Sequence, residues 1–443
     1  MFVCSQCQYS TPKWQGKCLN CNSWNTLTQE IVSAASKPLT RQSKALAKIN
    51  DIVELKKDRI LSKFKELNAV FGGGIVYGSV SILTGDPGVG KSTLAMQVAD
   101  SVAEKGLKVI YFSSEESLTQ LKKKLLMLNL EKSQVFFSEE SGIEGIIDYF
   151  KKEKPDLCII DSIQNCTLED GQQNFFGLNA LKESVFRIVQ AAKEFNVAVV
   201  MTGHITKDGF LAGPKILEHL IDAVFYLQDE VDFQRKILTS VKNRFGSIDE
   251  VGFFEMNENG FRDVANVNLQ ILEETNIKSI GSVLFLSFKG SRAVLSEFQS
   301  LCQKTKNVNP QRVSNGVDLK KIILIAAVLE KYLKIELSAF DIFFKIRGGL
   351  KLSENLSDLA ISLSLLSSYF KKPVDNKTIG IGEIHLNGKI SSLHNPEKLI
   401  KSAEKLGIER ILLGGNAKET GSGKMNVVPI THVYNLLELF SEK

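Results

Sequence analysis

The stretch from Gly85 to Ser92 contains the residue types that bind the phosphates of a nucleotide, in the pattern Gly85-x4-Gly90-Lys91-Ser92. An apolar run (residues 80–84) precedes it, and a stretch with helical periodicity (93–103) follows it. Glycines let the backbone N–H groups of such a loop surround phosphates at a helix N-terminus, where the helix dipole also favours anions. We predict a phosphate loop in which Lys91 approaches the γ-phosphate and Ser92 ligates Mg²⁺. Its predicted nucleotide-binding residues are Gly85, Asp86, Pro87, Gly88, Val89, Gly90, Lys91, Ser92 and Thr93.

Three further side chains follow apolar runs that we expect to be buried strands. Asp161 ends "LCIIDS" and suits the carboxylate that holds the Mg²⁺ shell in P-loop enzymes, although it could instead cap the next element. Glu115 and Glu116 follow "VIYFSS", where a carboxylate can deprotonate the attacking water; the alternative is a solvated acid at a helix start. His204 follows "VVMTG" and can contact the γ-phosphate or be a packed core histidine.

A pair of cations lies in "SVKNRFG" (residues 240–246), where Lys242 and Arg244 flank one amide. A surface loop can carry such residues for solubility alone. The charge that develops on a γ-phosphoryl group is often stabilised by an arginine or lysine supplied in trans. We therefore predict that both cations reach into the nucleotide site of a neighbouring subunit, while a DNA contact by the same residues stays open.

Four of the seven cysteines fall within the first 21 residues, as two Cys-x2-Cys pairs separated by ten residues. Two such pairs can bind one Zn²⁺ tetrahedrally, and four thiolates leave no open position for catalysis. A redox dithiol is disfavoured because the βαβ context is missing. We expect Tyr9, Trp14 and Trp24 to cover the site. The predicted zinc ligands are Cys4, Cys7, Cys18 and Cys21.

The composition and the apolar pattern indicate a multidomain α/β protein without a membrane span. Net charge is +5, hydrophobic content is 43%, and strand-like apolar runs alternate with amphipathic stretches. No apolar run reaches about 18 residues, and the N-terminus lacks a secretion signal, so we expect a cytoplasmic protein. We predict a zinc finger (1–28), a linker (29–58), an α/β ATPase domain with a mostly parallel sheet (59–276) and a second α/β domain (277–443).

The order of these marks resembles the bacterial DNA-repair ATPases of the RadA, or Sms, family over essentially the whole chain. The matching stretches are "WQGKC", "GDPGVGKST", "YFSSEES", "IIDSIQ", "GHITKDG" and "KNRFG". The resemblance implies a RecA-like ATP-hydrolysing core, assembled as a homo-hexameric ring like the DnaB helicase. It implies translocation on single-stranded DNA, branch migration of branched recombination intermediates, and action beside the RecA recombinase. By position, Glu115 matches the catalytic glutamate, and Lys242 and Arg244 match paired cationic fingers.

The C-terminal region resembles the proteolytic domain of Lon. Leu356 stands at the nucleophile position with Ser357 next to it, and Glu397 stands at the lysine position with Lys398 next to it. A Lon-type ATP-dependent protease is therefore the disfavoured alternative to a DNA-stimulated motor, and a nucleotide-switched binding module is a third. We expect a scaffold that supports the ring. Its basic residues either form a binding surface or belong to a solvated loop: Lys304, Lys306, Arg312, Lys320 and Lys321.

Overall fold

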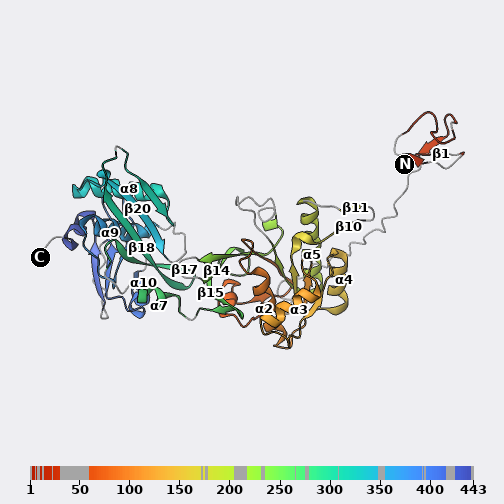
Figure 1. Ribbon diagram of the computed structural model, residues 1–443, viewed down its shortest axis with the longest axis horizontal. Coiled ribbons are helices and arrows are strands. Elements are labelled where there is room, and N and C mark those ends of the chain that lie inside the picture. Colours follow the sequence, from red (N-terminus) through yellow and green to blue (C-terminus); the bar gives the residue numbers. More distant parts are fainter. Residues whose placement is uncertain are drawn as a thin grey trace, which may run out of the picture. The chain divides into compact units, whose positions relative to one another are not determined.

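The computed structural model describes residues 2–4, 6, 10–11, 14–21, 23–29, 59–170, 173–174, 178–203, 217–230, 235–264, 266–274, 279–307, 309–347, 355–391, 393, 396–415 and 425–440 (Figure 1). The chain divides into two compact units, Met1–Lys56 and Lys57–Lys443. The predicted linker lies outside the described residues except for Gln29. None of the described helices is both long and apolar enough to span a membrane.

The first unit is built on a small antiparallel sheet with the strand order β2-β1-β3. Its strands are β1 (Phe2–Cys4), β2 (Ser10–Thr11) and β3 (Leu27–Gln29). Between β2 and β3 the chain folds back on itself, with a bridge between Lys17 and Trp24. Bonds from Cys18 N to Ser23 O and from Asn25 N to Gly16 O, both 2.9 Å, fix this hairpin. The hairpin therefore holds the second cysteine pair in a tight turn.

The second unit contains a nine-stranded sheet with the order β16-β15-β14-β13-β6-β12-β9-β7-β8. The run from β13 to β8 in this order is parallel, and β14, β15 and β16 extend one edge in antiparallel fashion. The prediction of a mostly parallel α/β sheet is therefore confirmed. The strands are β6 (Val80–Gly85), β7 (Val109–Ser113), β8 (Phe136–Ser138), β9 (Leu157–Asp161), β12 (Ala198–Thr202), β13 (Ala223–Glu230), β14 (Arg235–Asn243), β15 (Val251–Asn257) and β16 (Gly260–Asp263).

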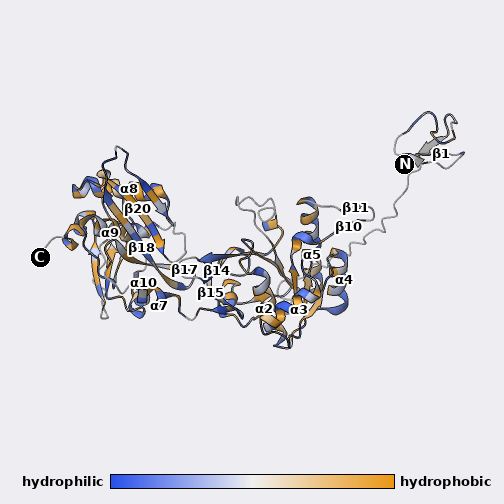
Figure 2. Ribbon diagram, in the orientation of Figure 1, coloured by the Kyte–Doolittle hydropathy of each residue, from blue (hydrophilic) through white to orange (hydrophobic). Residues whose placement is uncertain are grey.

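Helices cover both faces of this sheet. Successive residues of a strand enter different cores, as Tyr111 and the following Phe112 belong to the apolar clusters on opposite faces. Strands buried on both faces are apolar throughout, which explains the continuous apolar runs in the sequence (Figure 2). The helices are α1 (Lys65–Val70), α2 (Lys91–Ala103), α3 (Leu118–Met127), α4 (Ile143–Glu153) and α5 (Leu178–Phe195). Short elements complete this part: β4 (Arg59–Ile60), β5 (Ile75–Val76), η2 (Ile163–Asn165), β10 (Glu169–Asp170) and β11 (Gln173–Asn174).

The remaining chain forms a seven-stranded mixed sheet with the order β19-β20-β18-β17-β21-β22-β23. Its strands are β17 (Ser282–Lys289), β18 (Arg292–Lys304), β19 (Arg312–Asn315), β20 (Phe340–Arg347), β21 (Thr378–Ile381), β22 (Arg410–Gly414) and β23 (Asn426–Ile430). Its helices are α7 (Val267–Glu274), α8 (Leu319–Leu333), η4 (Leu337–Ala339), η5 (Asn355–Ser357), α9 (Asp358–Phe370), α10 (Pro396–Lys405) and η6 (Val433–Leu439). This sheet and its helices share one large apolar core.

The two large sheets touch through a small apolar cluster. Val294 of β18 packs with Phe253 of β15 and Val267 of α7. Nearby, Arg292 Nη1 lies 2.6 Å from Glu66 Oε2, with the Glu66 side chain nearly buried. Because apolar and ionic contacts occur together here, the start of β18 is anchored to the nine-stranded sheet and to α1.

Candidate nucleotide site and its partner groups

The phosphate loop connects the end of β6 to the start of α2, as the sequence predicts. Gly85 has φ 150°, and a Cβ there would lie 2.0 Å from Leu227 O, so any side chain would collide with β13. Gly90 has φ 104° and is the N-cap of α2, so its left-handed conformation also favours glycine. The first N–H groups of α2 consequently face the loop, where an anion can accept hydrogen bonds from them.

The Lys91 side chain lies inside this loop. Its Nζ donates to Gly85 O and to Asp86 O, each at 3.0 Å. Burial lowers the pKa of Lys91, while the carboxylates of Asp161, Glu115 and Asp86 act in the opposite direction. The ammonium is thus held by backbone carbonyls of the loop and surrounded by the acids that the sequence places at this site.

Asp161 is a buried carboxylate held by three hydroxyl groups. Its Oδ1 accepts from Ser92 Oγ at 3.1 Å and from the Thr202 hydroxyl, and its Oδ2 accepts from Tyr111 at 2.6 Å. Burial and the neighbouring Asp161 raise the pKa of Tyr111 well above its usual value, so this phenol remains a donor. These contacts join α2 to the middle of β7 and to the ends of β9 and β12. They favour the Mg²⁺-shell role of Asp161 over a cap on the next element, because Ser92 is the other predicted ligand.

The two glutamates after β7 have different surroundings. Glu115 is exposed, and its Oε1 accepts from Ser162 Oγ at 2.5 Å and from Asn165 Nδ2 at 3.2 Å. Glu116 turns to α3, where its Oε1 lies 2.5 Å from Lys124 Nζ. The geometry therefore favours Glu115 as the base, since only Glu115 contacts the residues that follow Asp161.

Lys242 and Arg244 lie at the other end of the sheet. Asn243 pairs with Ala223 at the start of β13, whereas the loop residue Gly85 pairs with Leu227. Four residues of strand separate these two levels, or about 13 Å at 3.3 Å per residue. Both cations therefore lie at the opposite end of the strands from the phosphate loop of their own chain.

The two cations are held differently. Arg244 Nη1 lies 3.1 Å from Asp222 Oδ1, and its side chain is half exposed. Lys242 Nζ donates to Ile221 O at 2.8 Å and to Glu218 O, and burial together with nearby Arg244 lowers its pKa. Lys242 thus stabilises the turn before β13, and Arg244 projects further into solvent.

Asp222 is the main residue that sequence reasoning missed. It is buried, and its Oδ2 also accepts from Val80 N at 3.1 Å, so one carboxylate ties Arg244 to the first residue of β6. The signal in the sequence is an aspartate directly before the apolar run "AVFYL". His204 lies outside the described residues, and its predicted role stays a prediction.

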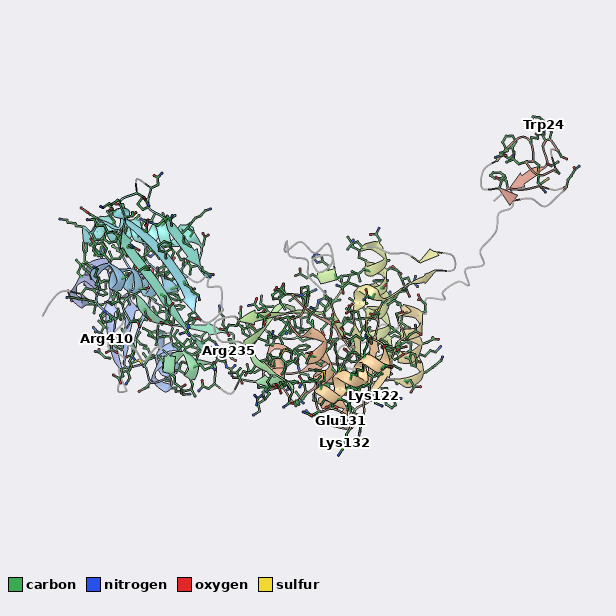
Figure 3. The ribbon with its side chains drawn as sticks, viewed as in Figure 1. Trp24, Lys122, Glu131, Lys132, Arg235 and Arg410 are labelled. Carbon is green, nitrogen blue, oxygen red and sulfur yellow. The ribbon has the colours of Figure 1, made fainter. Side chains whose placement is uncertain are left out.

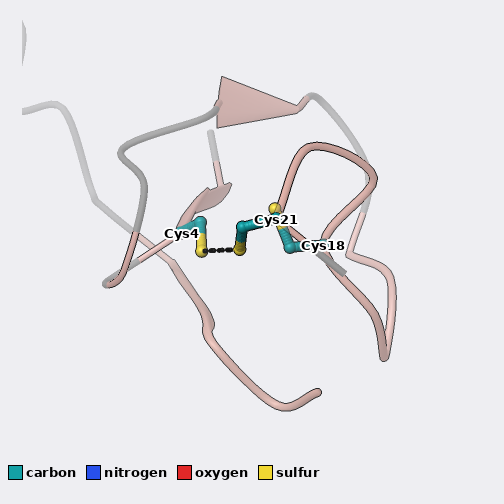
Figure 4. Close-up of side chains that lie close together, drawn as sticks. All are labelled: Cys4, Cys18 and Cys21. Atoms are coloured by element: carbon teal, nitrogen blue, oxygen red, sulfur yellow. Dashed lines mark hydrogen bonds between the residues drawn. The ribbon is translucent and has the colours of Figure 1, made fainter. Parts of the chain in front are cut away.

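The cysteine cluster of the first unit suits zinc. The thiol sulfurs of Cys4, Cys18 and Cys21 lie within 4.8 Å of one another, and Cys4 and Cys21 are 3.6 Å apart (Figure 4). Zn–S bonds of about 2.3 Å would place the sulfurs of a tetrahedral site about 3.8 Å apart, so the spacing fits this ion. Cys7, the predicted fourth ligand, lies outside the described residues.

The prediction that tryptophans cover this cluster is wrong. Trp14 is 59% exposed and Trp24 is 69% exposed, and Tyr9 lies outside the described residues. Among the described residues, partly buried Phe2 and Cys21 pack against the buried Cys4 and Cys18.

The protease-like position in the C-terminal half carries no accessible nucleophile. Leu356 packs against the core, and Ser357 is fully buried at the start of α9. The Lys398 ammonium lies 4.5 Å from the centre of the Phe288 ring. A buried hydroxyl cannot meet a polypeptide substrate, so Ser357 is not positioned to act as a nucleophile.

Comparison with known proteins gives concordant matches along the chain. Residues 44–209 match the family described as an AAA domain, and residues 2–29 match the rubredoxin metal binding domain. The DNA repair protein RadA of Listeria monocytogenes is 38% identical over 419 residues, which cover 94% of this chain and 92% of that protein. The protein of the same name from Bacillus subtilis is 34% identical over 446 residues, covering 99% and 97%.

One solved structure, of an isolated ATPase domain, is similar to part of the chain. It has a TM-score of 0.41 at 15% identity and covers 46% of this chain and 91% of that domain, a likeness too weak to add to the fold described above. The near-complete coverage of the curated relatives, together with their identities above 30%, decides the family. The chain carries an AAA-type ATPase domain and belongs to the family of the bacterial DNA repair protein RadA.

Proposed function

We propose that this chain is a DNA-dependent ATPase of recombinational DNA repair. In this proposal it moves along single-stranded DNA, processes branched intermediates by branch migration, and acts beside the RecA recombinase in the cytoplasm. The observation that carries the ATPase is the convergence of Lys91, Ser92, Asp161 and Glu115 at the carboxyl edge of one parallel sheet. The DNA-repair setting is taken from the names of the relatives, which are DNA repair proteins.

The chemistry assigned to each group follows from its position. Backbone N–H groups of the loop and Lys91 would bind the β- and γ-phosphates of ATP, and Ser92 and Asp161 would hold the Mg²⁺ shell. Bound Mg²⁺ would neutralise charge on the phosphate oxygens. Exposed Glu115 would orient a water molecule and take its proton, after leaving or sharing its bonds to Ser162 and Asn165.

The site is proposed to be completed by a second copy of the chain. Arg244 lies at the other end of the strands from its own phosphate loop, and its side chain is half exposed. Both observations support a contact with a neighbouring subunit rather than with its own loop. A ring of identical subunits brings one edge of each subunit against the other edge of the next, which is the heterologous arrangement that closed rings use. We propose a homo-hexamer, with Arg244 as the transition-state finger and Lys242 beside it.

The rate of ATP hydrolysis with and without single-stranded DNA tests this function. DNA should raise the rate, because translocation couples each hydrolysis step to a bound strand. The Lys91→Ala protein serves as the control, and it should show no stimulated hydrolysis because the γ-phosphate contact is lost. Equal rates in the presence and absence of DNA would reject the motor, and hydrolysis that persists in Lys91→Ala would reject the phosphate loop.

A further inference from the structure

The zinc-binding head exposes both tryptophans that the 443-residue chain contains. Trp14 and Trp24 are 59% and 69% exposed, and Trp24 projects from the surface of the head (Figure 3). The two indoles share one hairpin, whereas the other exposed large aromatic rings among the described residues lie singly on separate elements: Phe136, Tyr149, Phe186 and Tyr434. Indole rings are costly to leave in water, so two exposed ones on one small unit indicate a binding surface.

The two rings are held on one fixed hairpin. A Cβ added to Gly16 would lie 3.7 Å from Trp24 and 3.9 Å from Trp14, so both rings border the same glycine. The bridge between Lys17 and Trp24 and the bond from Asn25 N to Gly16 O set the backbone on each side. Because Cys18 and Cys21 lie on the same hairpin, the metal cluster would keep the rings in place.

The charges around the rings favour a polyanion. No aspartate or glutamate occurs before Glu30, whereas Lys13 and Lys17 are present. The Lys17 ammonium lies 5.9 Å from the centre of the Trp24 ring. The core of a docking surface for a protein is ordinarily depleted of lysine, which differs from the lysine beside the Trp24 ring.

We propose that the head binds single-stranded DNA by stacking bases on Trp14 and Trp24, with Lys17 beside a phosphate. Aromatic platforms with neighbouring cations bind single strands without sequence preference, because every base has a π-face. The ligand class rests on the proposed function, but the contact itself is separate from the ATPase site. The head thus acts as a second point of attachment to the strand on which the ATPase works.

Tryptophan emission of the full-length protein tests this directly, since both emitting rings are in the head. An oligothymidylate should quench the emission, and an abasic strand of equal length should not, because stacking requires bases. Trp14→Leu and Trp24→Leu should each remove part of the signal and weaken binding roughly fivefold or more. Zinc content should stay unchanged in both variants, which checks that the head is folded.

Leu19→Ala is the matched control. Leu19 is 66% exposed on the same turn but has no ring to stack, so its removal should leave DNA binding unchanged. An equal loss in Leu19→Ala and in the tryptophan variants would overturn the proposal in favour of an apolar docking surface for a protein. Unchanged emission at a DNA concentration that stimulates hydrolysis would overturn it while leaving the motor intact. Quenching without any stimulation would support the head contact and reject the motor.

Discussion

Glu115 and Glu116 are adjacent in the chain, yet their contacts give them different chemistry. Glu116 forms an ion pair with Lys124 of α3, which directs its carboxylate toward that helix. Glu115 is exposed and accepts two hydrogen bonds from the segment that follows Asp161. A general base has to reach both water and the phosphate site, and of the two glutamates we propose Glu115 for this role.

Replacing each glutamate by glutamine should separate the two roles. Glu115→Gln should slow the chemical step by about 10²- to 10⁴-fold, the usual contribution of a general base, while ATP binding is retained. Glu116→Gln is the matched control and should hydrolyse ATP at close to the normal rate, since its partner is Lys124. Single-turnover hydrolysis and nucleotide binding measure both effects. Normal turnover in Glu115→Gln would assign the base elsewhere.

The cysteine cluster should bind one zinc ion per chain. Three sulfurs already lie at distances that fit Zn²⁺, and Cys7 belongs to the same sequence pattern. Elemental analysis should give about one zinc per chain, and Cys18→Ser should lose it because three ligands bind Zn²⁺ far more weakly. A folded, metal-free head with four reactive thiols would be incompatible with this site.

For single residues, the sequence predicts a position just after a strand or within a loop, because that position depends only on the neighbouring sequence. Lys91, Ser92, Asp161 and Glu115 all follow apolar runs, and parallel strands bring such ends together. Asp222 and Tyr111 were missed because their roles depend on contacts with residues far along the chain, such as Val80. The exposure of the tryptophans was missed for a related reason, since a pattern of aromatic residues does not say which atoms cover them.

The β13–β14 hairpin is the element that sets the position of Arg244, the proposed cationic finger. It places Arg244 level with the first residues of β13, and Asp222 just before that strand holds the guanidinium. The same Asp222 accepts from Val80 N at the start of β6. The finger is thus fixed to the central strand whose far end carries the phosphate loop.

Asp222→Asn should loosen the finger without unfolding the hairpin. The amide can still accept from Val80 N but cannot pair with the guanidinium, so Arg244 loses its fixed orientation. We expect kcat to fall roughly 10- to 100-fold with little change in KM, as misplaced catalytic groups show. The thermal midpoint should stay close to that of the unmodified protein.

A double variant tests whether Asp222 acts on the rate of hydrolysis through Arg244. In an Arg244→Ala background, Asp222→Asn should cost little more, because residues that act through each other are not additive. Full additivity would show that Asp222 acts on something other than Arg244.

The elements themselves were predictable to different degrees. Parallel strands such as β9 and β12 are continuous apolar runs, so their type and their order with the helices could be predicted. The antiparallel extension by β15 and β16 could not, because strand pairing depends on the register of residues that are distant in the sequence.

At the scale of the whole molecule, the described position that the sequence aligns with a Lon-type nucleophile carries no accessible hydroxyl, since Leu356 and Ser357 both pack into the core. Ser357 is buried, and Lys398 lies over the Phe288 ring. Contacts of Val294 and Arg292 with the ATPase sheet point to a structural role for this half. These contacts could not be predicted from the sequence, since nothing in a local pattern says which surfaces of two sheets meet.

The full-length protein should not cleave casein, with or without ATP and DNA. The physical reason is that a serine needs both exposure and a base within hydrogen-bond reach to attack a peptide bond. An active Lon protease serves as the positive control for the assay. Cleavage that disappears in Ser357→Ala would contradict this expectation.

In the proposed mechanism, each ATP site is completed by Arg244 of a neighbouring copy. Arg244→Ala should lower turnover by roughly 10³-fold or more while leaving ATP binding nearly intact. Lys91→Ala should also be inactive, for the separate reason that its phosphate loop is impaired. Neither protein can hydrolyse ATP efficiently alone.

Mixing the two inactive proteins under conditions of subunit exchange is the most direct test. Random assembly from equal amounts places an intact loop against an intact finger at about one interface in four, because each interface joins two different edges of the subunits. We therefore expect DNA-stimulated hydrolysis to return to about that fraction, one quarter, of the rate of the unmodified protein. No recovery in rings that demonstrably contain both proteins would contradict it, and would place Arg244 on its own site or on DNA.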